Sequence, residues 1–329
     1  MKGRSQAGFT LIEVVIALTI LMVAIVPVLW ICSAAQRLTR SQSEASDLQQ
    51  RARVLVEKLQ RDLIMAGAGP PDGGVRLGDL LPPLVPARTG FRSPDPESSA
   101  FADRLSILYV PGDGWQASLA APMTSPAAAI AIDATAIGCP AAGLCGFTEA
   151  ARALIVDART PGAGFELFTV SGIIGELAHA APNPAFSQSY ANPSARVMPV
   201  VQRTYYVDRP SRRLMVYDGH LSDVPLLDNV ADVRFEYFAD ASPGPGLRAM
   251  PLSELSDGPL IGLPPNRFDV DLRAIRLVRV TIRLEADADD VRGAGEWFAR
   301  PGRSNSGLSL VPDFEVTFEV APRNMRASP

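Results

Sequence analysis

The stretch that decides the fold is residues 14–35, VVIALTILMVAIVPVLWICSAA, where 22 consecutive residues carry no charge. At about 1.5 Å per residue, a helix of this length covers roughly 33 Å, the thickness of a bilayer core. No second run of this kind follows, which excludes a multi-span transporter. Lys2 and Arg4 precede the run. They are expected to stay in the cytoplasm while the remaining ~290 residues cross the membrane.

Glu13 stands immediately before this run and is its most informative neighbour. An unpaired carboxylate inside hydrocarbon costs about 2.5–3.5 kcal/mol, so it calls for a partner or for a place among the headgroups. The headgroup alternative does not explain why Gly8 stands before Phe9. A cleaved secretory signal has an apolar region of about 7–15 residues and a small-residue cleavage site. The longer run, the lack of a convincing cleavage site and Glu13 disfavour that alternative.

Charge balance and scarce metal-binding side chains exclude several classes of function. Acidic residues (35) exceed basic ones (31), and the net charge of −4 argues against a nucleic-acid partner. Two histidines and three cysteines leave little material for a zinc site. Neither His179 nor His220 stands in a nucleophile or base context, and no G-x-S-x-G, Walker or G-x-G-x-x-G fingerprint lies between a strand and a helix. We therefore expect no enzymatic activity, no cofactor and no metal.

Beyond the apolar run, the pattern becomes that of an amphipathic helix with one packed and one wet face. It is predicted to end at about Ala66, because GAGPP at 67–71 is a strong stop signal. Pro27 is expected to kink or loosen the helix, since it removes one backbone hydrogen bond. The packed stripe comprises Leu48, Ala52, Leu55, Leu59 and Leu63, and the wet face Gln50, Arg53, Lys58, Arg61 and Asp62.

Downstream of the helix, runs of β-branched and aromatic residues follow one another, separated by Gly, Pro, Asp and Asn, as in strands. Because helical segments do not alternate with them, antiparallel sheet is the default. The predicted fold class is α+β, a long N-terminal membrane-spanning helix packed on an antiparallel β-sheet head. The expected strands are 104–110, 129–134, 153–158, 165–171, 197–207, 213–217, 230–238, 275–284 and 314–321.

Residues 8–18, GFTLIEVVIAL, follow a short basic leader and resemble the class III signal of type IV pilins and type II secretion pseudopilins. The resemblance implies that a prepilin peptidase cuts after Gly8 and that the new N-terminus on Phe9 is methylated. It also implies a filament core in which Glu13 pairs with the amino group of the neighbouring subunit's first residue. Such a pair sets register, because a subunit at the wrong height leaves a charge unpaired. Loss of the two leader cations changes the net charge from −4 to (31−2)−35 = −6.

Further pieces, in the same order along the chain, resemble PilW minor pilins and the related J-type minor pseudopilins of type II secretion. The resemblance implies a subunit of the type IV pilus tip complex that primes polymerisation. The implied partners are other minor pilins and the major pilin through the N-terminal helix, the prepilin peptidase, the inner-membrane assembly platform, and membrane lipid before assembly. The alternatives are a J-type pseudopilin and a pilin-anchored periplasmic adhesin or hydrolase. The matching pieces are 103–107, 203–207, 213–214, 226–237 and 273–280.

The expected layout is a leader at 1–8, a transmembrane and assembly helix at 9–35, an amphipathic spine helix at 36–66, and a periplasmic β-rich head at 67–329. In an oxidising periplasm, Cys139 and Cys145 are expected to form a small-loop disulfide that contributes about 2–3 kcal/mol. A metal site is the minor alternative, because two thiols are too few ligands. Cys32 is expected to be a small packing residue.

The acidic cluster of Asp287, Asp289 and Asp290 offers oxygen ligands of the kind that calcium prefers. Its spacing matches no calcium-binding loop. A solvated loop after a strand is therefore the favoured interpretation.

Overall fold

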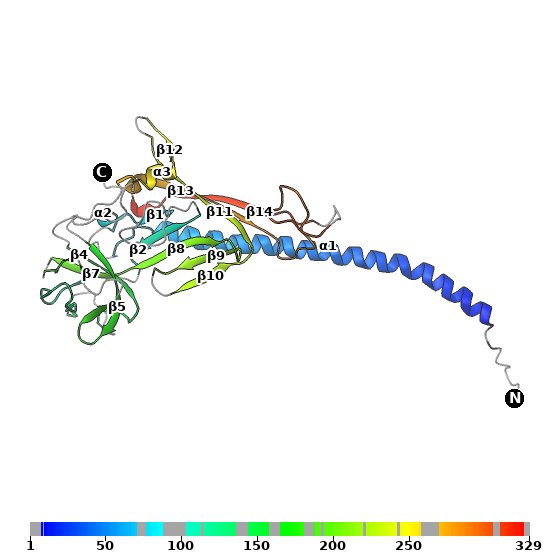
Figure 1. The fold of residues 1–329 in the computed structure, drawn as a ribbon, viewed down its shortest axis with the longest axis horizontal. Helices are drawn as coiled ribbons and strands as arrows, with labels where there is room; N and C mark the ends of the chain where they lie inside the picture. The colour runs from blue at the N-terminus through cyan, green and yellow to red at the C-terminus, as the bar shows by residue number, and fades with distance from the viewer. Residues whose placement is uncertain are drawn as a thin grey trace. The chain divides into compact units, whose positions relative to one another are not determined.

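The protein is described by a computed structural model. It has an α+β fold in which a long apolar N-terminal helix packs against antiparallel β-sheets, as the sequence predicts (Figure 1). The described residues are 8, 10–70, 77–87, 103–112, 115–135, 144–157, 165–180, 186, 188–191, 194–219, 222–241, 244–257, 270–304 and 310–325.

Helix α1 (Leu11–Met65) is 55 residues long and continues through Pro27, so the proline does not end it. The helix stops at Gly67, whose φ of 76° lies in the left-handed region that favours glycine. The Gly67 N–H donates to the carbonyl of Leu108 at 3.0 Å. A Cβ at position 67 would lie 2.9 Å from the Pro83 side chain. The predicted end near residue 66 is confirmed, and glycine is needed there for both conformation and space.

The chain divides into two compact units. The first consists of Met1–Gln50 and Glu285–Phe314, and the second of Arg51–Leu284 and Glu315–Pro329. Residues 285–314, which the expected layout places in the head, thus share a unit with the first part of α1.

The described strands form three sheets. Every strand pair whose register is known is antiparallel. The first has the order β1 (Leu84–Pro86), β2 (Leu105–Tyr109), β8 (Val201–Asp208), β9 (Arg213–Tyr217) and β10 (Asp223–Leu227). The second has the order β12 (Leu247–Met250), β11 (Val230–Asp240), β13 (Ile275–Leu284) and β14 (Phe314–Val320). The third has the order β3 (Ala117–Ser118), β7 (Ala195–Pro199), β4 (Arg152–Asp157), β5 (Phe165–Ile173) and β6 (Leu177–Ala180).

Short helical segments complete the described secondary structure. Two are α-helical and two are 3₁₀-helical. They are α2 (Leu77–Leu80), α3 (Leu252–Leu255), and the 3₁₀ turns Val270–Ala274 and Arg323–Met325.

Two predicted strands differ from the structure. The run 197–207 is two strands, β7 and β8, which belong to different sheets and are separated by Val200. The run 129–134 is not a strand, because Ile130 and Ile132 form only isolated bridges to Leu177 and Leu119. The sequence analysis also missed β1, β3, β6, β10 and β12. Each of these five lies at the edge of its sheet.

The predicted apolar stripe of α1 is buried. Its spacing of three to four residues places all five side chains on one helix face, which is the side removed from water. At about 25 cal/mol per Å² of apolar surface, this burial drives the packing of the helix. The five exposed fractions are 1% for Leu48, 3% for Ala52, 1% for Leu55, and 0% for Leu59 and Leu63.

Asp62 was predicted on the wet face, and this prediction is wrong because its side chain is 1% exposed. The Tyr109 hydroxyl on β2 donates to its Oδ1 at 3.2 Å, and the Tyr205 hydroxyl on β8 donates to its Oδ2. The ammonium group of Lys58, one turn earlier, lies 3.3 Å from Oδ2. Buried polar groups are tolerated when they are hydrogen-bonded, and these contacts meet that need. Asp62 therefore joins α1 to two neighbouring strands of the first sheet.

Replacing Asp62 should test this connection. Asp62→Ala leaves two tyrosine hydroxyls without their acceptor, so we expect it to lower the free energy of unfolding by about 2–4 kcal/mol. Urea unfolding of the detergent-solubilised chain measures the loss. The control is Glu57→Ala on the same helix, whose ion pair with Arg61 joins two exposed side chains. The control should change stability by less than about 0.5 kcal/mol. Equal effects of the two substitutions would contradict the role of Asp62.

The tyrosine at the surface of this cluster should titrate late. Burial, followed by the negative charge and hydrogen bond of Asp62, raises the pKa of Tyr109 from 10.0 to about 12. The folded chain then holds this proton where the unfolded chain releases it. The stability that it contributes is present below pH 10 and is lost as pH rises through 12. The difference in phenolate absorbance between the wild-type chain and Tyr109→Phe should have its midpoint near 12. A midpoint near 10 would contradict the burial of Tyr109 together with its contact to Asp62.

Candidate functional site

Of the predicted processing and assembly residues, the structure describes Gly8 and Glu13, and it adds Thr10, which lies between them. Gly8 is exposed and precedes α1, whereas Phe9 lies outside the described residues. Cleavage after Gly8 and methylation of Phe9 therefore stay predictions, because the structure does not describe both residues of the cleaved bond.

Glu13 is fixed to Thr10 by a capping box at the start of α1. Thr10 stands directly before the first helical residue, and its backbone N–H donates to Glu13 Oε2 at 2.9 Å. Its hydroxyl donates to the same oxygen at 2.8 Å. The backbone N–H of Glu13 donates in return to Thr10 Oγ1 at 3.4 Å. This reciprocal pair satisfies helix N–H groups that have no partner within the helix. Sequence reasoning missed this role, although TLIE at 10–13 carries the T-x-x-E signature.

The two oxygens of the Glu13 carboxylate have different surroundings. Oε2 accepts both hydrogen bonds from Thr10, whereas Oε1 makes none with the residues that the structure describes. A carboxylate can accept several hydrogen bonds, so the capping box leaves acceptor capacity on the second oxygen. The site can therefore hold its own helix end and still receive a cationic donor from outside the chain.

Helix α1 presents its apolar residues outward around this site. Among the described residues, it is the one helix that is long and apolar enough to cross a membrane, and none of its most apolar window is buried. Ile20 is 65% exposed and Trp30 is 68% exposed. Cys32 is a free cysteine on the same exposed surface, so the packing expected of it is not made within this chain. Apolar surface of this extent requires lipid or other helices to cover it.

The other candidate residues fall into structural roles. His179 Nε2 lies 3.0 Å from the Ala128 carbonyl oxygen, and its ring stacks on Phe186 with centroids 4.2 Å apart. His220 and Cys139 lie outside the described residues. Cys145 is buried, but the pairing of Cys139 with Cys145 stays a prediction.

The acidic cluster after β13 is engaged by arginines rather than arranged around a cation. Asp289 lies 2.8 Å from Arg303, and Asp290 lies 2.8 Å from Arg40. The backbone N–H of Asp287 donates to Glu44 at 3.2 Å. Within the described part of the chain, no group of three or more His, Cys, Asp or Glu side chains is arranged to hold a metal. The favoured interpretation from the sequence is a solvated loop after a strand, and the side chains of Asp289 and Asp290 are partly exposed, at 42% and 48%.

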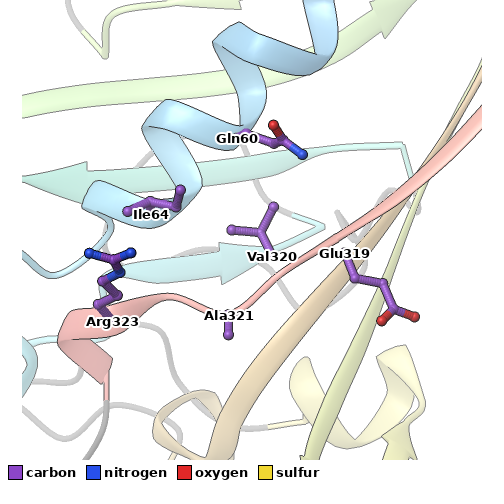
Figure 2. A pocket seen from close by; sticks show the side chains of 6 residues that line it. All are labelled: Gln60, Ile64, Glu319, Val320, Ala321 and Arg323. Carbon is purple, nitrogen blue, oxygen red and sulfur yellow. The ribbon is translucent and has the colours of Figure 1, made fainter.

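A groove in the second unit lies between the end of α1 and β14 (Figure 2). It has a volume of about 670 Å³. Glu319 points away from the helix in Figure 2 and accepts two hydrogen bonds from Arg279, at 2.9 and 2.7 Å. Among the described lining residues, no nucleophile stands beside a base. Its lining residues are Gln60, Ile64, Glu319, Val320, Ala321 and Arg323.

Comparison with known proteins identifies the N-terminal segment. A model of the prokaryotic N-terminal methylation motif matches residues 3–29, which include Gly8, Phe9 and Glu13. No curated protein and no solved structure showed significant similarity to the chain. The motif implies processing by a prepilin peptidase and assembly into a pilus or pseudopilus, with anchoring in the inner membrane beforehand. The N-terminal segment is therefore that of a type IV pilin-like prepilin.

Proposed function

We propose that the protein is a minor pilin, a structural subunit of the type IV pilus tip complex that primes filament polymerisation. The observation that carries the proposal is a single carboxylate, Glu13, held at the start of α1, whose apolar first part its own chain leaves uncovered. The methylation motif over residues 3–29 supports it. Pilin-like proteins of this kind work by packing rather than by catalysis.

The proposed cycle begins in the inner membrane. The head lies in the periplasm, the peptidase cuts after Gly8, and lipid covers α1 until assembly. During assembly, other minor pilins and the major pilin replace the lipid around the helix. The inner-membrane platform provides the place where this exchange occurs.

Glu13 is proposed to set the height of the subunit during that exchange. Its Oε2 stays bonded to Thr10, while Oε1 receives the amino group of the neighbouring subunit's first residue. A charge pair in an apolar surrounding adds little net stability, but a mismatched height leaves both charges unpaired. The capping box keeps the carboxylate in one orientation, so the pair forms at one register. Thr10 is thus a positioning residue for Glu13.

The same N-terminal machinery would serve a J-type pseudopilin of type II secretion. The two functions differ in the filament that contains the chain. Recovery with sheared pili supports the proposal, and recovery only with the secretion pseudopilus would replace it.

Substitutions at Glu13 separate its charge from its capping role. Glu13→Ala should still insert in the membrane, because it removes a carboxylate from hydrocarbon, but should be almost lost from the sheared filament fraction. Glu13→Gln keeps an acceptor for Thr10 and removes the charge, so it should also assemble poorly. Immunoblots of membrane and filament fractions measure both steps.

Thr10→Ala is the companion variant, because it removes only the hydroxyl contacts to Glu13. We expect the amount of Thr10→Ala in the filament fraction to lie between the amounts of the wild-type chain and of Glu13→Ala. Wild-type incorporation of Glu13→Gln would show that capping, and not charge, is the function of Glu13. That result would end the register proposal.

A further inference from the structure

The connection between β13 and β14 contacts the part of α1 that follows the apolar run. Its Asp290 carboxylate lies 2.8 Å from the Arg40 guanidinium, and the Asp287 N–H donates to Glu44 Oε2 at 3.2 Å. The connection and this part of the helix belong to the same compact unit. Figure 1 shows the connection lying beside α1. The exposed pair with Arg40 adds little stability, but it locates the connection along the helix.

The described part of the connection, residues 285–304 and 310–313, is held together by its own backbone contacts. Its two arms are joined by backbone hydrogen bonds, with the Arg303 N–H donating to Asp289 at 2.7 Å and the Val311 N–H to Val291 at 2.9 Å. Gly302 permits the closest approach, since a Cβ there would lie 1.9 Å from the Arg292 carbonyl oxygen. These contacts join the described parts of the connection to each other.

A buried charge cluster also stabilises the connection. The Glu285 side chain is fully buried, 2.6 Å from Arg300 and 3.8 Å from Arg292. Together with the pairs of Asp289 and Asp290, these contacts neutralise three carboxylates of the connection. An acidic loop would be repelled by anionic lipid, and this pairing reduces that repulsion.

Trp297 projects from this fixed connection. Its side chain is 72% exposed, although the adjacent Phe298 is buried at 7%. The Trp297 carbonyl oxygen accepts the Asp313 N–H at 3.0 Å, so the backbone beneath the indole is held. An exposed tryptophan on a hydrogen-bonded backbone presents a large apolar surface with one polar N–H.

The pair between Arg40 and Asp290 places the start of the connection just beyond the apolar run of α1. Arg40 follows the end of the apolar run at residue 35 by five residues, which is about 7.5 Å along a helix. The headgroup layer is about 5–7 Å thick on each side of the hydrocarbon core. With the topology of the proposed function, Asp290 thus stands near the outer edge of the headgroup layer, and Trp297 follows it by seven residues in the same connection.

We propose that Trp297 docks the β13–β14 connection on the periplasmic face of the inner membrane, with its indole among the lipid headgroups. Tryptophan favours this layer because its ring is apolar and its N–H finds acceptors there. The contact fixes the tilt and height of the membrane-bound subunit before assembly. The inference rests on the membrane topology of the proposed function.

The test uses the full chain in phosphatidylethanolamine and phosphatidylglycerol vesicles. Some of the lipids carry bromine, which quenches tryptophan, either near the headgroup or near the chain end. The chain has three tryptophans, Trp30, Trp115 and Trp297. Emission of Trp30→Phe minus that of the double variant Trp30→Phe/Trp297→Phe isolates Trp297. Emission of Trp297→Phe minus that of the double variant isolates Trp30, and Trp115 cancels in both.

Trp297 should lose emission with the headgroup-proximal bromine and less with the deep bromine, while Trp30 is quenched as a residue of the apolar run. Loss of emission by Trp30 alone would overturn the inference and leave the proposed function intact. No loss by either residue would overturn the membrane anchor itself. If Trp297 is unquenched and Trp297→Ala fails to enter filaments, the indole contacts a neighbouring subunit, which also overturns the proposal.

Discussion

The structure depends on one constraint, a carboxylate at the start of a helix whose apolar first part is not covered by its own chain. The apolar surface of α1 must be covered by lipid or by other helices. Glu13 restricts how neighbouring helices can pack there, because its carboxylate needs a partner. Its local partner is Thr10, which engages one oxygen and leaves the other available. The capping box and the proposed contact with a neighbouring subunit are therefore compatible, because they use different atoms of the same group.

The second half of α1, in contrast, is covered by its own chain. Its apolar stripe is buried, and Asp62 adds a polar connection to β2 and β8 inside that apolar contact. Burying a carboxylate among apolar residues costs free energy unless hydrogen-bond donors lie next to it. Asp62 therefore favours the one rotation of the helix that brings it to its donors. Glu13 and Asp62 are thus both carboxylates whose need for a partner selects one arrangement of the helix. One acts within the chain, and the other is proposed to act between chains.

The helix, its stripe and the antiparallel class could be predicted because they depend on local periodicity. The bounds of β9 and β13 match their predicted runs, whereas those of β4 and β11 differ by one or two residues, although all four strands have neighbours on two sides. The five missed strands are short edge strands, which gain hydrogen bonds on one side only and need little hydrophobic pattern. Asp62 was misplaced because its tyrosine partners lie 47 and 143 residues away. The contact between Arg40 and Asp290 was equally hidden, since no local pattern relates positions 250 residues apart.

The most direct test of the central claim is mass spectrometry of the protein extracted from membranes. The account predicts a mature N-terminus at Phe9 with one added methyl group and loss of the eight-residue leader. An intact Met1, or a cut after Ala34 or Ala35, would contradict it. The first result would leave the helix an ordinary anchor, and the second would make it a secretory signal.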